Sequence, residues 1–222
     1  LIFCSFDYTP ELIQAIKDTG LPAAITSFYE NSGSDRFYDC IYASQPRAAW
    51  CATKHCIEMG HTRIAFLGGD PKEQNTRERF EGYRQAMEEA GLAVEMDLVI
   101  YADFTRAGAS HQFQQFIMEN GQCTAVVACN DLMAIGCMNA CGTLGLKVPE
   151  NISIVSLDNT EYCLCTNPLI TSVDMMQNQV GTEAVKLIMD RIINKRCYRK
   201  DLVFSPNIIR RDSVKQLMPM KK

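Results

Sequence analysis

The sequence contains no long apolar run and no excess of basic side chains. Its apolar stretches are broken by Gly, Asp or Cys within about ten residues, whereas a membrane-spanning helix needs about 18–20. Lys and Arg number 22 and Asp and Glu 26, which gives a formal net charge of −4. A nucleic-acid-binding domain usually needs a basic face to replace the counterions of the phosphates. We therefore expect a soluble protein without a membrane segment, and we do not expect these residues to bind nucleic acid by themselves.

Motifs for metal binding and catalysis are also missing. The eleven cysteines include no CxxC pair, and the three histidines have no HExxH spacing. Cys56 is adjacent to His55, but neighbours on a helix do not face each other and cannot act as nucleophile and base. An odd number of cysteines, several of them in apolar runs, favours reduced thiols and a cytoplasmic protein. We predict no metal site, no cofactor and no catalytic residue.

The sequence does contain a regular alternation of strand and helix patterns, in a composition with 47% hydrophobic residues that is ordinary for a globular protein. The predicted strands are Leu1–Phe6, Pro22–Thr26, Cys40–Ala43, Arg63–Leu67, Leu98–Tyr101, Thr124–Ala128, Ile152–Leu157, Ile170–Val173, Leu202–Phe204 and Ile208–Arg210. The predicted helices are Pro10–Thr19, Pro46–Met59, Thr76–Ala90, Ala107–Glu119, Asp131–Leu144 and Gln177–Ile193. Glycines such as Gly60, Gly91 and Gly145 are expected to end helices. This alternation predicts an α/β fold with parallel sheets covered by helices on both faces.

Polar and aromatic side chains follow four consecutive predicted strands of the central region. These residues are Arg79, Phe104, Asn130 and Asp158. Ligands of open parallel sheets bind outside the carboxyl ends of the strands, so we expect the four to share one rim and to line a solvated cleft. Such groups suit a compact ligand rich in hydroxyl or amide groups, with a ring face that Phe104 covers. Each also has a structural alternative: a solvated arginine, a core phenylalanine, a helix cap and a turn residue.

Six segments in order carry a family resemblance. They are MGHTRIAFLGG (59–69), RERFEGYRQAMEEAGL (77–92), TAVVACNDLMAIG (124–136), GLKVPENISIVSLDN (145–159), PLITSV (168–173) and VFSPNIIRRDS (203–213). The chain closely resembles the effector-binding domain of the LacI/GalR family of bacterial transcription regulators. The opening LIFCS and the segment 190–196 are most similar to the purine-repressor branch.

The resemblance implies a periplasmic-binding-protein-like fold of type I, in which two doubly wound lobes enclose an effector cleft. The N-terminal lobe would comprise residues 1–58 and 173–200, and the C-terminal lobe residues 59–172 and 201–213, followed by a tail over 214–222. Members of the family begin with a helix-turn-helix and further strands, so we expect the N-terminal lobe to be truncated here.

The resemblance also implies contacts with the effector. In the C-terminal lobe it assigns them to Asn75, Arg79, Phe104, Asn130 and Asp158. A weaker position in the N-terminal lobe matches Ser5, and a variable crossover position matches Met175 or Gln177. The chain departs from the family pattern at Thr26-Ser27, where an Asp is common, and this difference affects the half of the pocket that identifies the ligand.

The function implied is allosteric and not enzymatic. A carbohydrate or purine effector would shift the arrangement of the lobes in a homodimer and so control operator binding by a helix-turn-helix that precedes these residues. An extracytoplasmic sugar-binding protein of a transporter is the alternative on the same fold. An enzyme is the third possibility, with Asp131 and Asp158 as acid and base, but no nucleophile or phosphate-binding loop accompanies them.

Overall fold

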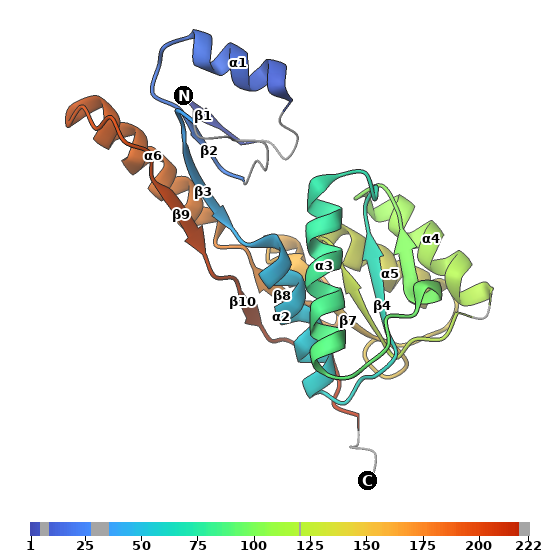
Figure 1. Ribbon diagram of the computed structural model, residues 1–222. Helices are drawn as coiled ribbons and strands as arrows, with labels where there is room; N and C mark the ends of the chain where they lie inside the picture. The colour runs from blue at the N-terminus through green and yellow to red at the C-terminus, as the bar shows by residue number, and fades with distance from the viewer. Residues whose placement is uncertain (5–8, 28–35, 120, 218–222) are drawn as a thin grey trace. The chain divides into compact units, whose positions relative to one another are not determined.

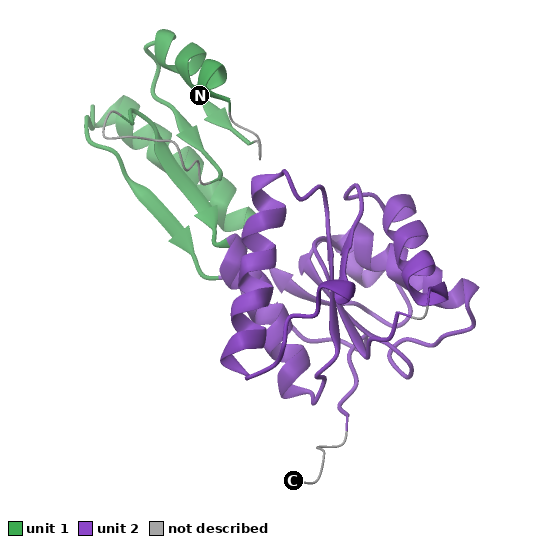
Figure 2. Ribbon diagram, turned by 45° about the vertical axis from the view of Figure 1, so that its right-hand side comes forward, with its two compact units in different colours: residues 1–44, 176–205 green, residues 45–175, 206–222 purple. Residues whose placement is uncertain are grey.

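The computed structural model describes residues 1–4, 9–27, 36–119 and 121–217. The chain forms two compact units, each built from segments that are distant in the sequence (Figure 2). Unit 1 comprises residues 1–44 and 176–205, and unit 2 comprises residues 45–175 and 206–222. The prediction of an α/β fold with two parallel-sheet lobes is confirmed.

Unit 1 is a parallel sheet with one helix on each face. In the described part of the chain its strands follow the order β1 (Ile2–Phe3), β2 (Ala24–Ile25), β3 (Asp39–Ala43) and β9 (Asp201–Phe204). Ile25 packs with Ile16 of α1 (Pro10–Asp18), whereas Ala24 packs with Leu187 of α6 (Gln177–Ile193). Because successive side chains of a strand point to opposite faces, α1 and α6 cover opposite sides of the sheet.

Unit 2 is a larger sheet with helices on both faces (Figure 1). Its strands follow the order β10 (Asn207–Ile209), β8 (Thr171–Asp174), β7 (Ser153–Asp158), β6 (Ala125–Ala128), β4 (Ile64–Gly68) and β5 (Val99–Tyr101). Only β10 is antiparallel to its neighbour in this described sheet. The helices are α2 (Gln45–Glu58), α3 (Gln74–Glu89), α4 (Arg106–Met118) and α5 (Asp131–Thr143). Helix α2 packs on α3 and α4 packs on α5. The strand order reverses between β5 and β6, so right-handed crossovers place the two pairs on opposite faces.

Local signals in the sequence account for several helix ends. Asn130 caps α5, because its Oδ1 accepts a hydrogen bond of 2.7 Å from the backbone NH of Met133. Gly60, Gly91 and Gly145 follow α2, α3 and α5 with φ values of +91°, +70° and +69°. Glycine adopts this left-handed conformation without a Cβ penalty, so the predicted helix stops are confirmed.

The boundaries of the two units differ from the predicted lobes. The resemblance places α2 in the N-terminal lobe, but the helix packs on α3 and on strands of unit 2. Strand β9 was assigned to the C-terminal lobe, but Leu202 pairs with Ile41 of β3 in unit 1. The expected tail is also partly integrated, since the backbone NH of Leu217 donates to the carbonyl of Met59. Apolar periodicity shows that a segment is a helix or a strand, but it does not identify the sheet that the segment joins.

No helix within the described ranges is both long and apolar enough to cross a membrane.

Candidate functional site

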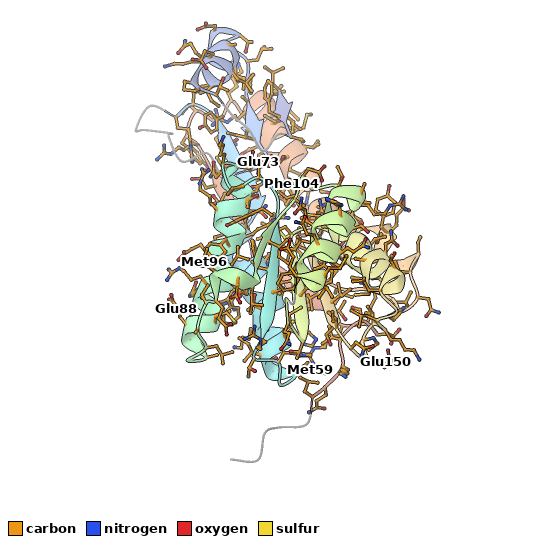
Figure 3. The ribbon with its side chains drawn as sticks, turned by 90° about the vertical axis from the view of Figure 1, so that its right-hand side faces the viewer. Met59, Glu73, Glu88, Met96, Phe104 and Glu150 are labelled. Carbon is orange, nitrogen blue, oxygen red and sulfur yellow. The ribbon has the colours of Figure 1, made fainter. Side chains whose placement is uncertain are left out.

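The carboxyl ends of four neighbouring strands of unit 2 form one edge of its sheet. Strands β4, β5, β6 and β7 are parallel, so the loops that follow them start at the same edge. Figure 3 shows Phe104, which follows β5, and Glu73, which precedes α3, at the same end of unit 2. Met59 and Glu150 lie at the opposite end. We call the loops at the first end, together with the start of α3, the rim of unit 2.

The side chain of Arg79 makes three hydrogen bonds at the rim. Its Nε donates to Gln45 Oε1 at 2.8 Å and its Nη2 donates to Asp158 Oδ1 at 3.2 Å. Its Nη1 donates to the backbone carbonyl of Cys129, directly after β6. The residue is only 4% exposed, so the structural alternative of a solvated helix arginine is wrong. The sequence did not reveal this burial, because the same helix also contains Arg77 and Arg84, which are not buried.

Asp158 ends β7 and is held in an uncommon conformation. Its φ is +107° and that of the next residue, Asn159, is +54°. Two successive non-glycine residues with positive φ are costly and persist only where the surrounding structure holds them. Asn159 is held by Arg211, whose Nη2 donates to its Oδ1 at 2.7 Å. The strain is therefore built into the loop that presents the carboxylate.

The environment of Asp158 raises the pKa of its carboxyl group. Burial raises the pKa of this carboxyl to about 6, and the negative charge of Asp131 acts in the same direction, while Arg79 opposes both. The side chain of Asp158 is nevertheless 24% exposed, so it is accessible to a ligand.

Phe104 lies over a glycine rather than in the core. A Cβ built on Gly69 would lie 1.9 Å from Cε2 of the Phe104 ring, so only glycine permits this close approach. Phe104 has a φ of +59° and is half-buried. Its carbonyl accepts a hydrogen bond of 3.1 Å from Asn130 Nδ2. Asn130 is thus the predicted helix cap and also the residue that fixes the position of Phe104.

The buried carboxylate of Asp131 joins the elements that carry the rim. Asp131, 2% exposed, accepts hydrogen bonds from Ser156 Oγ at 2.5 Å and Ser172 Oγ at 2.9 Å. It also accepts from the NH and Oγ1 of Thr160 at 2.6 and 2.7 Å. These bonds tie α5 to β7, β8 and the loop after Asp158. From the sequence, Asp131 was a candidate only as an acid or base of an enzyme. Ser156, within the apolar strand ISIVSL, was the signal of a buried polar partner.

The remaining predicted residues are distributed differently. Asn75 is half-buried on α3, one turn before Arg79 and therefore on the same side of the helix. Its neighbour Thr76 was not predicted, yet it is 1% exposed with an Oγ1 that has no hydrogen-bond partner among the described residues. Gln177 is exposed at the start of α6 and belongs to unit 1, whereas Met175 is buried in unit 2. Ser5 lies outside the described residues.

The rim offers binding groups and few reactive ones. Cys129, whose carbonyl contacts Arg79, has a thiol pKa that burial raises to about 12, so it is neutral and a poor nucleophile. In the described part of the chain, no three His, Cys, Asp or Glu side chains come together as a group that could hold a metal ion. An aromatic ring, a carboxylate and an amide on a shared edge are groups that orient a small polar ligand.

Comparison with known proteins gives consistent results. The profile of the periplasmic binding protein-like domain family matches residues 53–214. The HTH-type transcriptional repressor PurR of Aliivibrio salmonicida (strain LFI1238) is 31% identical over 217 residues, which are 98% of this chain and 64% of the relative. PurR of Vibrio campbellii (strain ATCC BAA-1116) is 33% identical, with 98% of this chain and 64% of the relative covered.

A solved structure shows the same architecture. A complex of the transcriptional regulator CelR with cellobiose superposes with a TM-score of 0.86 at 27% identity, over 96% of this chain and 64% of that one. The chain spans about 64% of the length of the curated relatives that it matches. The chain belongs to the periplasmic binding protein-like domain family, and the predicted resemblance to the effector-binding domain of LacI/GalR regulators is confirmed.

Proposed function

We propose that this chain is the ligand-sensing part of a transcription regulator and that it binds a small effector at the rim of unit 2. The observation that carries the proposal is that the loops of the rim have a strained backbone and are joined by hydrogen bonds. Phe104, Asp158 and Asn159 all have positive φ values there, between +54° and +107°. Arg79 and Asn130 hold these loops by hydrogen bonds to Asp158 and to the Phe104 carbonyl. Strain of this kind, concentrated at a ligand-binding edge, is typical of a preorganised site.

The open hydrogen-bonding groups of the rim suit a carbohydrate or a purine. Oδ1 of Asp158 accepts from Arg79, and no described residue donates to its Oδ2, which leaves that oxygen for a hydroxyl or a ring NH of the effector. Arg79 has five N–H donors, of which three are used. The half-buried ring of Phe104 can cover the flat face of the ligand. The named relatives are consistent with both classes, since one is a cellobiose complex and others are repressors named PurR.

We further propose that the effector acts by allostery on DNA binding. The curated relatives are named HTH-type transcriptional repressors and are longer than this chain, so the operator would be bound by a helix-turn-helix outside these 222 residues. In a homodimer, an effector that binds one arrangement of the units more tightly shifts the population of dimers that fit a two-fold operator. All eleven cysteines are unpaired, which fits a reducing cytoplasm. The alternative, an extracytoplasmic sugar-binding protein, is not favoured, because these relatives are named transcriptional repressors.

Isothermal titration of the chain with cellobiose, ribose, hypoxanthine and guanine tests the proposal. We expect one of these ligands to bind saturably, and Phe104→Ala to weaken its binding by about 1–2 kcal/mol through loss of the ring contact. Asp158→Asn should weaken the binding of the same ligand, because an amide group replaces a carboxylate oxygen that can accept a hydrogen bond. Asp97→Asn, an exposed change outside the rim, is the matched control. Equal affinity of the Asp158→Asn, Asp97→Asn and unmodified chains would refute the assignment of the rim.

A further inference from the structure

Unit 1 contains a basic cavity that is separate from the rim of unit 2. Its volume is about 280 Å³, and it is lined by Lys17, Gly20, Leu21, Pro22, Phe37, Arg191 and Arg196. These residues come from the end of α1, the segment before β2, the segment before β3, the end of α6 and the loop after it. A hollow of this volume suits a small ligand.

Positive charge exceeds negative charge around this cavity. Arg191 and Arg196 share the fully buried carboxylate of Asp39, through ion pairs of 2.9 and 2.7 Å. Arg196 and Lys200 share Asp190, at 2.6 and 3.3 Å. Lys17 lines the cavity without an ion pair to either carboxylate, and Lys200 reaches the group only through Asp190. These four cations and two carboxylates together carry an excess of two positive charges.

The carboxylate of Asp39 has no capacity left for a further donor. Its two oxygens accept two bonds from Arg191, two from Arg196 and one from the backbone NH of Lys200. A carboxylate offers about four lone-pair sites, so five donors saturate it. Any remaining hydrogen-bonding capacity of the arginines must therefore be met by another acceptor.

Arg191 and Lys17 have that remaining capacity. Arg191 bonds to Asp39 through Nε and Nη2, and no described residue accepts from its Nη1. Lys17 is exposed and its ammonium has no acidic partner among the described residues. Arg196, only 8% exposed, donates from all three nitrogens to Asp39, Asp190 and two backbone carbonyls, so it contributes charge but no free donor.

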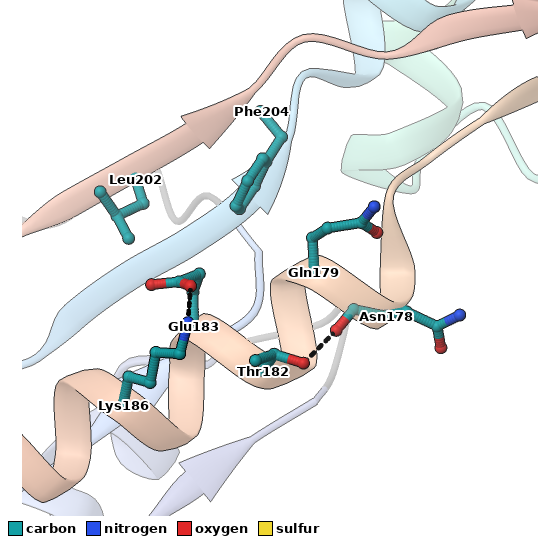
Figure 4. A pocket seen from close by; sticks show the side chains of 7 residues that line it. All are labelled: Asn178, Gln179, Thr182, Glu183, Lys186, Leu202 and Phe204. Atoms are coloured by element: carbon teal, nitrogen blue, oxygen red, sulfur yellow. Dashed lines mark hydrogen bonds and ion pairs between the residues drawn. The ribbon is translucent and has the colours of Figure 1, made fainter.

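A second groove of unit 1 lacks these properties. It lies between α6 and β9 and has a volume of about 530 Å³ (Figure 4). Its lining cation, Lys186, is already paired with Glu183 at 2.6 Å. The groove between α6 and β9 and the basic cavity therefore differ in charge as well as in size.

We propose that the basic cavity of unit 1 is a second ligand site, which binds a small organic anion through its phosphate or carboxylate group. Arg191 Nη1 and Lys17 Nζ would donate to the anion, and Arg196 would contribute its charge. Leu21, Pro22 and Phe37 would contact the apolar part of the ligand. This pairing matches the charge-assisted hydrogen bonds that guanidinium groups form with phosphate and carboxylate oxygens.

Side-chain NMR of the ¹⁵N-labelled chain tests the site. Inorganic phosphate and succinate are titrated separately at constant ionic strength, and the Nε–H signals of Arg191 and Arg196 are followed. We expect at least one of the two anions to shift the Arg191 signal saturably, and the anion with the lower midpoint identifies the preferred head group. Lys17→Gln should weaken that binding about threefold, as expected for one exposed charge.

Two variants separate binding from a general charge effect. Lys186→Gln removes one charge from α6 outside the cavity and should leave the midpoint unchanged. Asp158→Asn alters the rim of unit 2 and should also leave it unchanged. A linear response to both anions, or equal weakening by Lys17→Gln and Lys186→Gln, would show that the arginines only neutralise Asp39 and Asp190. Circular dichroism of each variant verifies that it is folded.

Discussion

Asp39 of unit 1 and Asp158 of unit 2 are both carboxylates beside arginine, but their pKa values shift in opposite directions. Burial alone would raise the pKa of Asp39, yet hydrogen bonds from Arg196 and Arg191 hold it below its ordinary value. Burial of Asp158 raises its pKa to about 6, because one long contact with Arg79 does not offset the desolvation.

The difference lies in the number of donors. Asp39 receives five hydrogen bonds, four of them from guanidinium groups, and is completely buried. Asp158 receives one side-chain bond from Arg79 and is partly exposed. A saturated carboxylate joins elements of the fold, whereas an undersaturated one is available to a ligand.

Removal of the Asp39 carboxylate should have the largest effect. Asp39→Ala leaves Arg191 without an ion-pair partner among the described residues and leaves Arg196 with Asp190 alone. We expect the free energy of unfolding to fall by about 3–5 kcal/mol. Urea unfolding followed by circular dichroism measures this loss. Asp18→Ala, at an exposed position of the same unit, should change stability by less than about 0.5 kcal/mol. Similar values for the two variants would contradict the structural role of Asp39.

Removal of the Arg79 side chain should have an intermediate effect on stability. Arg79→Ala leaves Asp158 and the Cys129 carbonyl without their donor, and we expect a loss of about 2–3 kcal/mol in the free energy of unfolding. Effector binding should be lost in the same variant, because Asp158 is no longer positioned. Arg77→Ala, an exposed change on the same helix, is the control for both measurements. Unchanged stability of Arg79→Ala would mean that the arginine is solvated after all.

The pH dependence of stability should show the smallest effect. The folded pKa of Asp158, about 6, lies above its ordinary value of 3.8, so the folded state binds more protons between these limits. The free energy of unfolding should therefore rise by about 1 kcal/mol as the pH falls from 7 to 5. Asp158→Asn should flatten this part of the curve.

Asp39 should act in the opposite sense. Its lowered pKa contributes stability above 3.8, and that contribution is lost as the pH falls below this value. Urea unfolding at a series of pH values would separate the two carboxylates. If the free energy of unfolding of the Asp158→Asn chain still rises as the pH falls from 7 to 5, Asp158 is not the titrating group.

Much of the fold and of the rim could be predicted from the sequence. Apolar strands followed by glycine-terminated helices predicted both parallel sheets, and the position of residues just after strands predicted that Arg79, Phe104, Asn130 and Asp158 share one edge. Their role in ligand binding stays a prediction. The burial of Arg79 and the Asp131 network were not predicted, because each depends on partners from several strands and helices.

The sequence by itself determined the α/β class, the order of the elements, the helix stops and the family, because these depend on local periodicity, turn residues and motifs. Only the tertiary structure decided which sheet α2 and β9 join, how many donors each carboxylate receives and where the basic cavity lies. These properties arise when side chains far apart in the sequence meet: Asp39 and Arg196 are 157 positions apart and Arg79 and Asp158 are 79 apart. The charge state of a carboxylate depends on such neighbours, and no local pattern encodes them.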